Sequence, residues 1–150
     1  MMQSMSSFTD RSYRVARDGR SVVCDSIARR DELDALRDAI AWQRDRQSWM
    51  NLDDVDSVLA LRALTAVDDV LAQTTALESE ALVTLSREQA RVLCEVAGTY
   101  VTERDVDSYQ APEERARIAR LRALAGPLMD TCCELAAAEE EAREKALLTS

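Results

Sequence analysis

Pairs of carboxylates are the residues of this sequence whose spacing would suit catalysis. Three such pairs lie three residues apart in stretches that we expect to be helical: Asp31 and Asp34, Asp53 and Asp56, and Glu141 and Glu144. Each pair shares one helix face, as the paired acids of all-helical magnesium-dependent nucleotide pyrophosphatases do. Helix capping and solvation explain the same pairs, because they stand at predicted helix starts or near residue 150. Of the possible functions, the pyrophosphatase is therefore the least favoured by the sequence.

The chain contains no histidine. This excludes Ser-His-Asp and Cys-His nucleophiles, histidine general bases and nearly all zinc and di-iron bundle sites. Three glycines, at 19, 98 and 126, are too few for a phosphate-binding loop. We therefore predict a protein that is not an enzyme, with no catalytic or metal-binding residues, no cofactor and no small-molecule substrate.

Cysteine usage and hydropathy bear on the compartment. The four cysteines, at 24, 94, 132 and 133, have no framework spacing, which is typical of buried or half-buried thiols in a reducing cytoplasm. No apolar run approaches the roughly 20 residues of a membrane span, and residues 1–10 lack the pattern of a signal peptide. The expected location is the cytoplasm, or a virion if the protein is viral.

Charge is distributed unevenly along the chain, whose net charge is -9. Residues 1–31 carry six arginines against four aspartates, whereas residues 32–111 carry sixteen acids against seven arginines. Phosphate binding needs a basic face, and the one possible basic patch lies near the N-terminus, at Arg11, Arg14, Arg17 and Arg20. The balance argues against nucleic acid as a partner. The acidic block keeps open a small soluble inhibitor or regulator, such as a viral anti-defence protein that imitates nucleic acid.

A β-hairpin is the clearest local prediction. Asp18-Gly19 suits a two-residue type I′ loop, and it would place Tyr13 opposite Cys24 and Val15 opposite Val22. These four side chains then share one face of the ribbon. A lone hairpin is marginal in water, so this face must lie on a helix or on another chain.

Helical periodicity accounts for most of the remaining sequence. Five helices are expected, over about 31–48, 51–75, 86–104, 112–126 and 128–147. Apolar residues cover more than half of the second helix, which predicts a central, buried position. Ser86 and Gln89 form a capping box for the third, Gly98 suggests a close helix crossing, and Gly126-Pro127 should separate the last two. Residues 81–85 fit a short strand or an extended link equally well.

The first helix has two apolar stripes. Leu33, Leu36 and Ile40 form the inner one, and Trp42 and Trp49 share a second with Ala35 and Ala39. The tryptophans either pack under the hairpin or a neighbouring helix, or anchor a partner, since tryptophan concentrates in interface hot spots. Trp42, Trp49, Ala35 and Ala39 are therefore the candidate protein-interaction residues.

These observations predict a mainly α protein, a bundle of about five helices with a small N-terminal β-hairpin. Residues 1–10 would be a polar tail, 11–50 the hairpin plus a helix, and 51–150 the bundle, in one cooperative unit with 11–50. The favoured function is a non-enzymatic structural or adaptor subunit that binds protein in a homo- or hetero-oligomer. A phage or archaeal virus particle is one such assembly.

Overall fold

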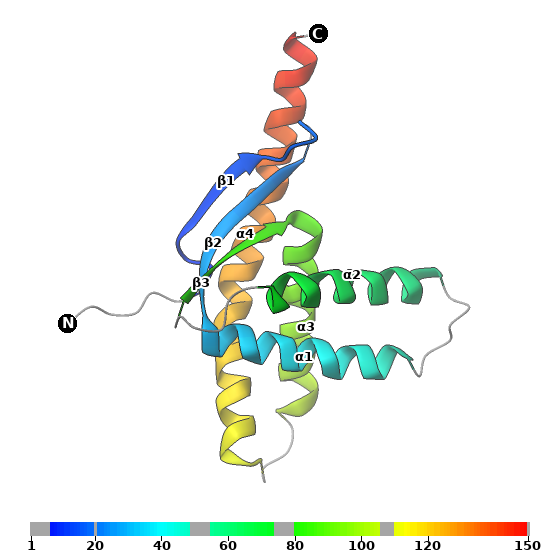
Figure 1. Cartoon of the computed structure of the whole chain (residues 1–150), viewed down its shortest axis with the longest axis vertical. Helices are drawn as coiled ribbons and strands as arrows, with labels where there is room; N and C mark the ends of the chain where they lie inside the picture. The colour runs from blue at the N-terminus through cyan, green and yellow to red at the C-terminus, as the bar shows by residue number, and fades with distance from the viewer. Residues whose placement is uncertain (1–6, 20, 49–54, 74–79, 106–109, 150) are drawn as a thin grey trace, which may run out of the picture.

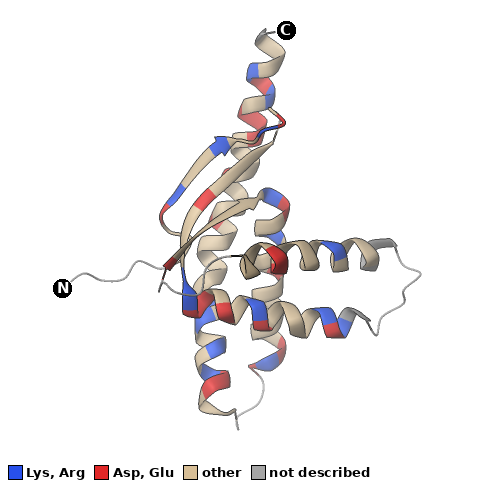
Figure 2. Ribbon diagram, in the orientation of Figure 1, with Lys and Arg blue, Asp and Glu red and all other residues tan. Residues whose placement is uncertain are grey.

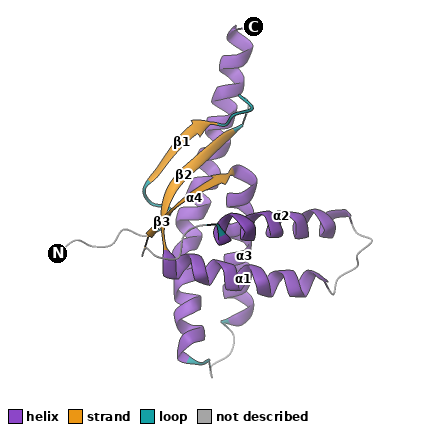
Figure 3. Cartoon of the chain, in the orientation of Figure 1, coloured by secondary structure: helices purple, strands orange, loops and turns teal. Residues whose placement is uncertain are grey.

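A computed structural model describes residues 7–19, 21–48, 55–73, 80–105 and 110–149 of the 150-residue chain. These residues form four helices and a three-stranded antiparallel sheet (Figures 1 and 3). The strands are β1 (Arg11–Val15), β2 (Val22–Arg29) and β3 (Glu80–Ser86), and the helices are α1 (Arg30–Ser48), α2 (Val55–Ala72), α3 (Arg87–Arg104) and α4 (Pro112–Thr149). The mainly helical class with an N-terminal β element is confirmed. None of the described helices has both the length and the apolar character needed to cross a membrane.

The hairpin has the predicted ladder but a wider turn. Tyr13 pairs with Cys24 and Val15 with Val22, which confirms the register. At the turn, the Ala16 amide donates to the Ser21 carbonyl at 2.8 Å, and the Gly19 amide donates to the Ala16 carbonyl at 3.0 Å. The predicted two-residue loop is therefore wrong. The Gly19–Ala16 hydrogen bond instead closes a turn that begins at Ala16, with Gly19 at a φ of 74° that favours glycine.

The open question about residues 81–85 is resolved as a strand. β3 pairs antiparallel with β2, which becomes the centre of the sheet. Val83 and Leu85 face the core and Leu82 faces outward, as the period of two requires. The sheet thus joins residues from the predicted 11–50 and 51–150 segments, so the boundary at residue 50 does not separate two structural units.

The last two predicted helices are one continuous helix, α4, so the described residues contain four helices rather than five. Pro127 lies inside α4 and lacks the amide that would bind the Ala123 carbonyl. That carbonyl belongs to an exposed residue, which water reaches. Leu124 and Leu128, on either side of the proline, are fully buried against the core. Packing along both halves therefore holds the helix together where local propensity predicts a break.

α2 is a peripheral helix, which corrects the prediction that it is central and buried. Figure 1 shows it beside α1, at the edge of the molecule. Leu64, Val67 and Leu71 face the core, but Leu59 is 55% exposed. α2 therefore presents apolar surface to solvent.

The core otherwise follows the predicted stripes. Leu33, Leu36 and Ile40 of α1 are fully buried, as expected. The capping box of α3 is present: Ser86 Oγ accepts from the Gln89 amide at 3.2 Å, and the Gln89 side chain accepts from the Ser86 amide at 2.9 Å. The close crossing expected at Gly98 is absent, because a β-carbon there would meet no atom within 4 Å.

The predicted polar tail is wrong for the part of residues 1–10 that the structure describes. Ser7 and Phe8 are buried, and the Phe8 amide donates to the Ile27 carbonyl at 3.0 Å. Ser7 Oγ donates to the buried Glu32 carboxylate at 2.8 Å and accepts from the Arg29 amide at 2.7 Å. These bonds hold the N-terminal residues against the start of α1, with Phe8 at a φ of 64°.

Candidate functional site: an apolar groove between three helices

A groove of about 370 Å³ lies between α1, α2 and α3. Its apolar lining comes from two helices: Leu59, Ala60, Ala63 and Leu64 of α2, and Val92 and Val96 of α3. Its polar lining comes from α1 and α3: Gln43, Glu88, Arg91, Glu95 and Thr99. Leu64, Val92 and Val96 form the buried floor, and Leu59 stands at the opening.

The groove exists because α2 carries more apolar residues than its neighbours cover. Leu64, Val67 and Leu71 repeat at three- and four-residue spacing and face the core. Leu59 and Ala60 lie one turn before Leu64, on the side that opens to solvent. The wide apolar face of α2 is visible in the sequence. A helix buried in the core and a helix that borders an open groove give the same pattern, so the sequence alone does not distinguish them.

Charged side chains of α3 border the groove. Arg91 pairs with Glu88 at 3.3 Å and with Glu95 at 3.1 Å. All three side chains are more than half exposed, so each ion pair contributes little to stability. The two carboxylates outweigh the single guanidinium, and the rim therefore carries a net negative charge.

The described lining of the groove has the composition of a binding surface. Its apolar residues come from α2 and α3, and its charged residues are the exposed Glu88, Arg91 and Glu95. An apolar centre with a polar rim is the arrangement of protein-protein interfaces. A groove between helices is also a common receptor for an amphipathic helix.

A second cleft, of about 380 Å³, lies between α1 and α4 and contains one of the predicted acid pairs. Asp31 and Asp34 both line it, but each faces an arginine. Asp31 lies 3.4 Å from Arg120, and Asp34 lies 3.5 Å from Arg30. Among the residues that the structure describes, no cluster of histidine, cysteine and acidic side chains could hold a metal ion.

Of the other two acid pairs, the structure describes the side chains of only Glu141 and Glu144. Asp53 lies outside the described residues, as does the side chain of Asp56. Glu141 and Glu144 are exposed near the end of α4. Glu141 pairs with Lys145 at 3.4 Å, one helical turn later.

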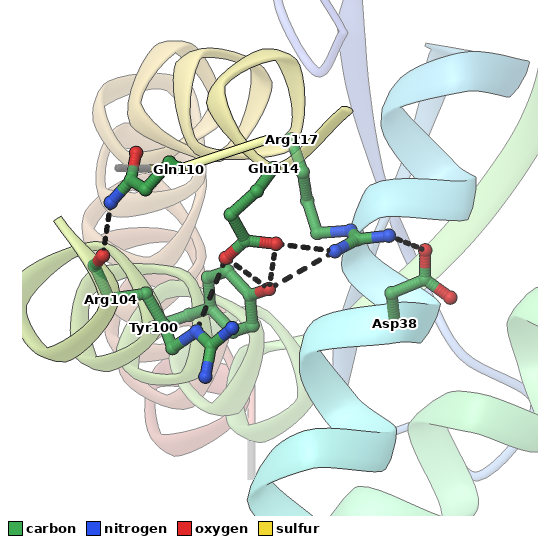
Figure 4. A network of polar contacts seen from close by, with 6 residues as sticks. All are labelled: Asp38, Tyr100, Arg104, Gln110, Glu114 and Arg117. Atoms are coloured by element: carbon green, nitrogen blue, oxygen red, sulfur yellow. Dashed lines mark hydrogen bonds and ion pairs between the residues drawn. The ribbon is translucent and has the colours of Figure 1, made fainter. Parts of the chain in front are cut away.

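Beside the second cleft, a network of polar contacts joins α1, α3 and α4 (Figure 4). The Tyr100 hydroxyl donates to the Glu114 carboxylate at 2.8 Å, and Arg104 donates to it at 3.2 Å. Arg117 donates to Glu114 at 2.6 Å and pairs with Asp38 of α1 at 3.2 Å. One carboxylate at the start of α4 thus binds side chains from the end of α3 and from its own first turns.

The network shifts the titration of its members. Burial raises the pKa of the Tyr100 hydroxyl, and its hydrogen bond to Glu114 raises it further. Burial alone would raise the pKa of Glu114, but hydrogen bonds from Tyr100 and Arg104 and the charge of Arg117 outweigh it, so this pKa lies below its usual value. The network keeps Glu114 ionised and Tyr100 neutral, which suits a structural role in holding the three helices together. Nothing in the sequence marked it, because its members come from three different helices.

The predicted protein-interaction residues of α1 lie mostly inside the chain's own core. Ala35 and Ala39 are buried. Trp42 is half-buried and meets the Tyr100 ring edge-on at 5.1 Å, with the Arg46 guanidinium 4.8 Å from its centre. Trp49 lies outside the described residues. Over its described part, the second stripe of α1 is therefore covered within the chain, with Trp42 against α3.

The possible basic patch is largely neutralised by neighbouring acids. Arg11 pairs with Glu134 of α4 at 2.6 Å, and the Tyr13 hydroxyl donates to the same carboxylate. The hydrogen bond from Tyr13, and after it the one from Arg11, hold the pKa of the Glu134 carboxyl below its usual value. Arg14 pairs with Asp25 at 2.7 Å.

The remaining two arginines of the patch are Arg17, which is exposed, and Arg20, which lies outside the described residues. Basic and acidic segments stand close together along α1 and α4 as well (Figure 2). At Arg11 and Arg14, the hairpin therefore presents paired charges.

The cysteines follow the prediction in part. Cys24 is buried, and burial raises the pKa of its thiol to about 11. Cys94 is half-buried, and burial raises its pKa as well. Cys132 is also half-buried, whereas Cys133 is exposed.

Comparison with known proteins assigns no relationship to this fold or to the groove. No protein-family model, curated protein or solved structure matches the chain.

Proposed function

We propose that the protein is a non-enzymatic subunit of an oligomeric assembly and acts by binding protein in the groove between α1, α2 and α3. The observation that carries this proposal is the exposed apolar opening of the groove, where Leu59 is 55% exposed above the buried Val92 and Val96. Covering such a surface releases water and stabilises a complex.

The proposal moves the binding surface from α1, where sequence alone put it, to α2. Ala35 and Ala39 are covered within the chain, so they offer a partner no apolar area. The neighbouring Leu59, Ala60 and Ala63 are partly or largely open. We propose a virus particle as the kind of assembly. The proposed location is the cytoplasm or that particle.

Two variants test whether the groove is the binding surface. Leu59→Arg places a charge at the opening, and Leu82→Arg places the same charge on the outer face of β3. Both leucines are more than half exposed, at 55% and 66%, so both variants should fold. The measurement is the native mass of the tagged chain, purified and in extracts of its own host cells, by gel filtration with light scattering.

We expect the wild type and Leu82→Arg to run above the 16.7 kDa of one chain in at least one of these settings. Leu59→Arg should run at or near the mass of a monomer. A wild type that is monomeric in both settings contradicts the proposed function. Equal behaviour of the two variants contradicts the groove as its site.

A further inference from the structure

The last turns of α4 carry a second exposed apolar feature, far from the groove. Leu147 and Leu148 are 74% and 85% exposed. Every side chain from Arg143 to Leu148 is exposed, and we call these six residues the tip. Figure 1 shows the tip extending past the sheet, while α1 and α2 lie toward the opposite half of the molecule. The tip therefore cannot reach the groove of its own chain.

We infer that the tip of one copy binds the groove of a second copy. This inference rests on the proposed function and names the partner as another molecule of the same chain. Leu147 and Leu148 are the convex apolar element, and Leu59, Val92 and Val96 provide the concave one.

Charge at the two surfaces is complementary. Within the tip, Lys145 pairs with Glu141 at 3.4 Å, so Arg143 is the cation that can meet a partner's acids. On the rim of the groove, Glu88 and Glu95 outweigh Arg91. Arg143 lies one turn before Leu147, on the same side of the helix, and it has no ion-pair partner within the described part of the chain. Docking the leucines would bring Arg143 close to the acidic rim, where opposite charges favour correct encounter.

The size of the groove also suits the tip. A volume of about 370 Å³ lies near the lower end for binding pockets. It suits the two leucines of a helix end better than the full face of a long helix. Because α4 projects as a straight element, little conformational entropy is lost when its last turns bind.

The contact is head-to-tail, because two different surfaces meet. Each copy has one tip and one groove, so binding leaves an unused tip at one end and an unused groove at the other. Such contacts continue until they close into a ring or extend as a filament. The wild-type chain should therefore form species larger than a dimer as its concentration rises.

Two complementary variants test the inference with purified full-length chain. The tip variant carries Leu147→Asp and Leu148→Asp, and the groove variant carries Leu59→Arg. All three leucines are exposed in the single chain, and circular dichroism with thermal unfolding checks that both variants fold. Met129→Asp, at an exposed position of α4 outside the tip, is the matched control.

We expect each variant alone to be a monomer by light scattering, because each has lost one half of the contact. An equal mixture should form a complex of twice the 16.7 kDa chain mass and no larger species, since it joins an intact tip to an intact groove. Met129→Asp should assemble as the wild type does. Arg143→Glu should weaken assembly about two- to fivefold at low salt, with a smaller effect at high salt.

Three results overturn the inference. The first is a wild type that stays monomeric when purified. A larger mass in host extract would then leave the proposed function standing, with a different partner. The second is a mixture of the two variants that stays monomeric. The third is a tip variant that assembles like the wild type while the groove variant does not, because the groove then binds some other part of the second copy.

Discussion

Glu114 is the residue on which the most side chains converge. Tyr100, Arg104 and Arg117 all donate to its carboxylate, which is 13% exposed. Hydrogen bonds to a charged group of low exposure contribute more than those on the surface. The same hydrogen bonds favour the ionised form of Glu114 in the folded chain, and they therefore lower its pKa.

Glu114→Gln should lower the free energy of unfolding by about 1–3 kcal/mol near pH 7. The pKa of Glu114 is lower in the folded chain than in the unfolded one. Its contribution is therefore complete above the usual carboxyl pKa and is lost as pH falls through the folded value. The difference between wild type and variant should shrink on acidification, as measured by urea unfolding from pH 7 to pH 3. Glu113→Gln, on the exposed neighbour, is the control and should change stability by less than about 0.5 kcal/mol. A difference that does not depend on pH would contradict this account.

At the scale of elements, α4 is held together at the point where its sequence opposes a helix. A proline inside a helix costs about 3 kcal/mol relative to alanine, and Gly126 beside it adds to this. The side chains that offset the cost, Leu121, Leu124, Leu128 and Leu135, are all fully buried. Thr131 Oγ1 also donates to the Pro127 carbonyl at 2.8 Å, within the turn that the proline begins.

Pro127→Ala should raise the free energy of unfolding by about 1–3 kcal/mol, because the new amide can bind the Ala123 carbonyl. Chemical denaturation measures the change. Gly126→Ala is a second variant at an exposed position with no atom within 4 Å of the added methyl, and we expect a gain of about 1 kcal/mol. Unchanged or lower stability in Pro127→Ala would mean that the packing of α4 depends on the proline ring itself.

Local sequence signals predicted where the helices and strands form better than they predicted what each element packs against. Asp18-Gly19 and the alternating residues beside it placed the ladder of Tyr13 and Cys24 correctly, because register follows from a short-range pattern. The Ser86 capping box placed the start of α3 for the same reason. Gly126-Pro127 led to the wrong prediction of two separate helices, since buried leucines up to one turn on either side hold α4 together.

The candidate site was much harder to predict than the elements. The apolar excess on α2 indicates either burial in the core or an exposed groove, and only the positions of α1 and α3 decide between them. The stripe of Ala35, Ala39 and Trp42 was predicted to meet a protein partner. Ala35 and Ala39 are instead buried within the chain, and Trp42 meets Tyr100 of α3, neighbours that no pattern within α1 could specify.

At the scale of the whole molecule, α4 is the element on which the others assemble. Its 38 residues extend about 57 Å at the rise of an α-helix. One end of α4 meets α1 and α3 through Glu114 and Arg117, and Glu134 further along binds β1. The groove and the tip lie far apart on this frame (Figure 1), so neither surface obstructs the other.

The contact of Tyr13 and Arg11 with Glu134 spans 121 and 123 residues of sequence, and this separation constrains the order of folding during synthesis. The hairpin leaves the ribosome first, but an isolated hairpin is marginally stable. β3 arrives later, and the helix that supports the sheet emerges last. Released chains truncated at residue 111, which contain β3 but lack α4, should therefore be cleaved by protease within the hairpin, whereas the full chain should be protected there. Equal protection in both would mean that β3 and α1 suffice to hold the hairpin before α4 is made.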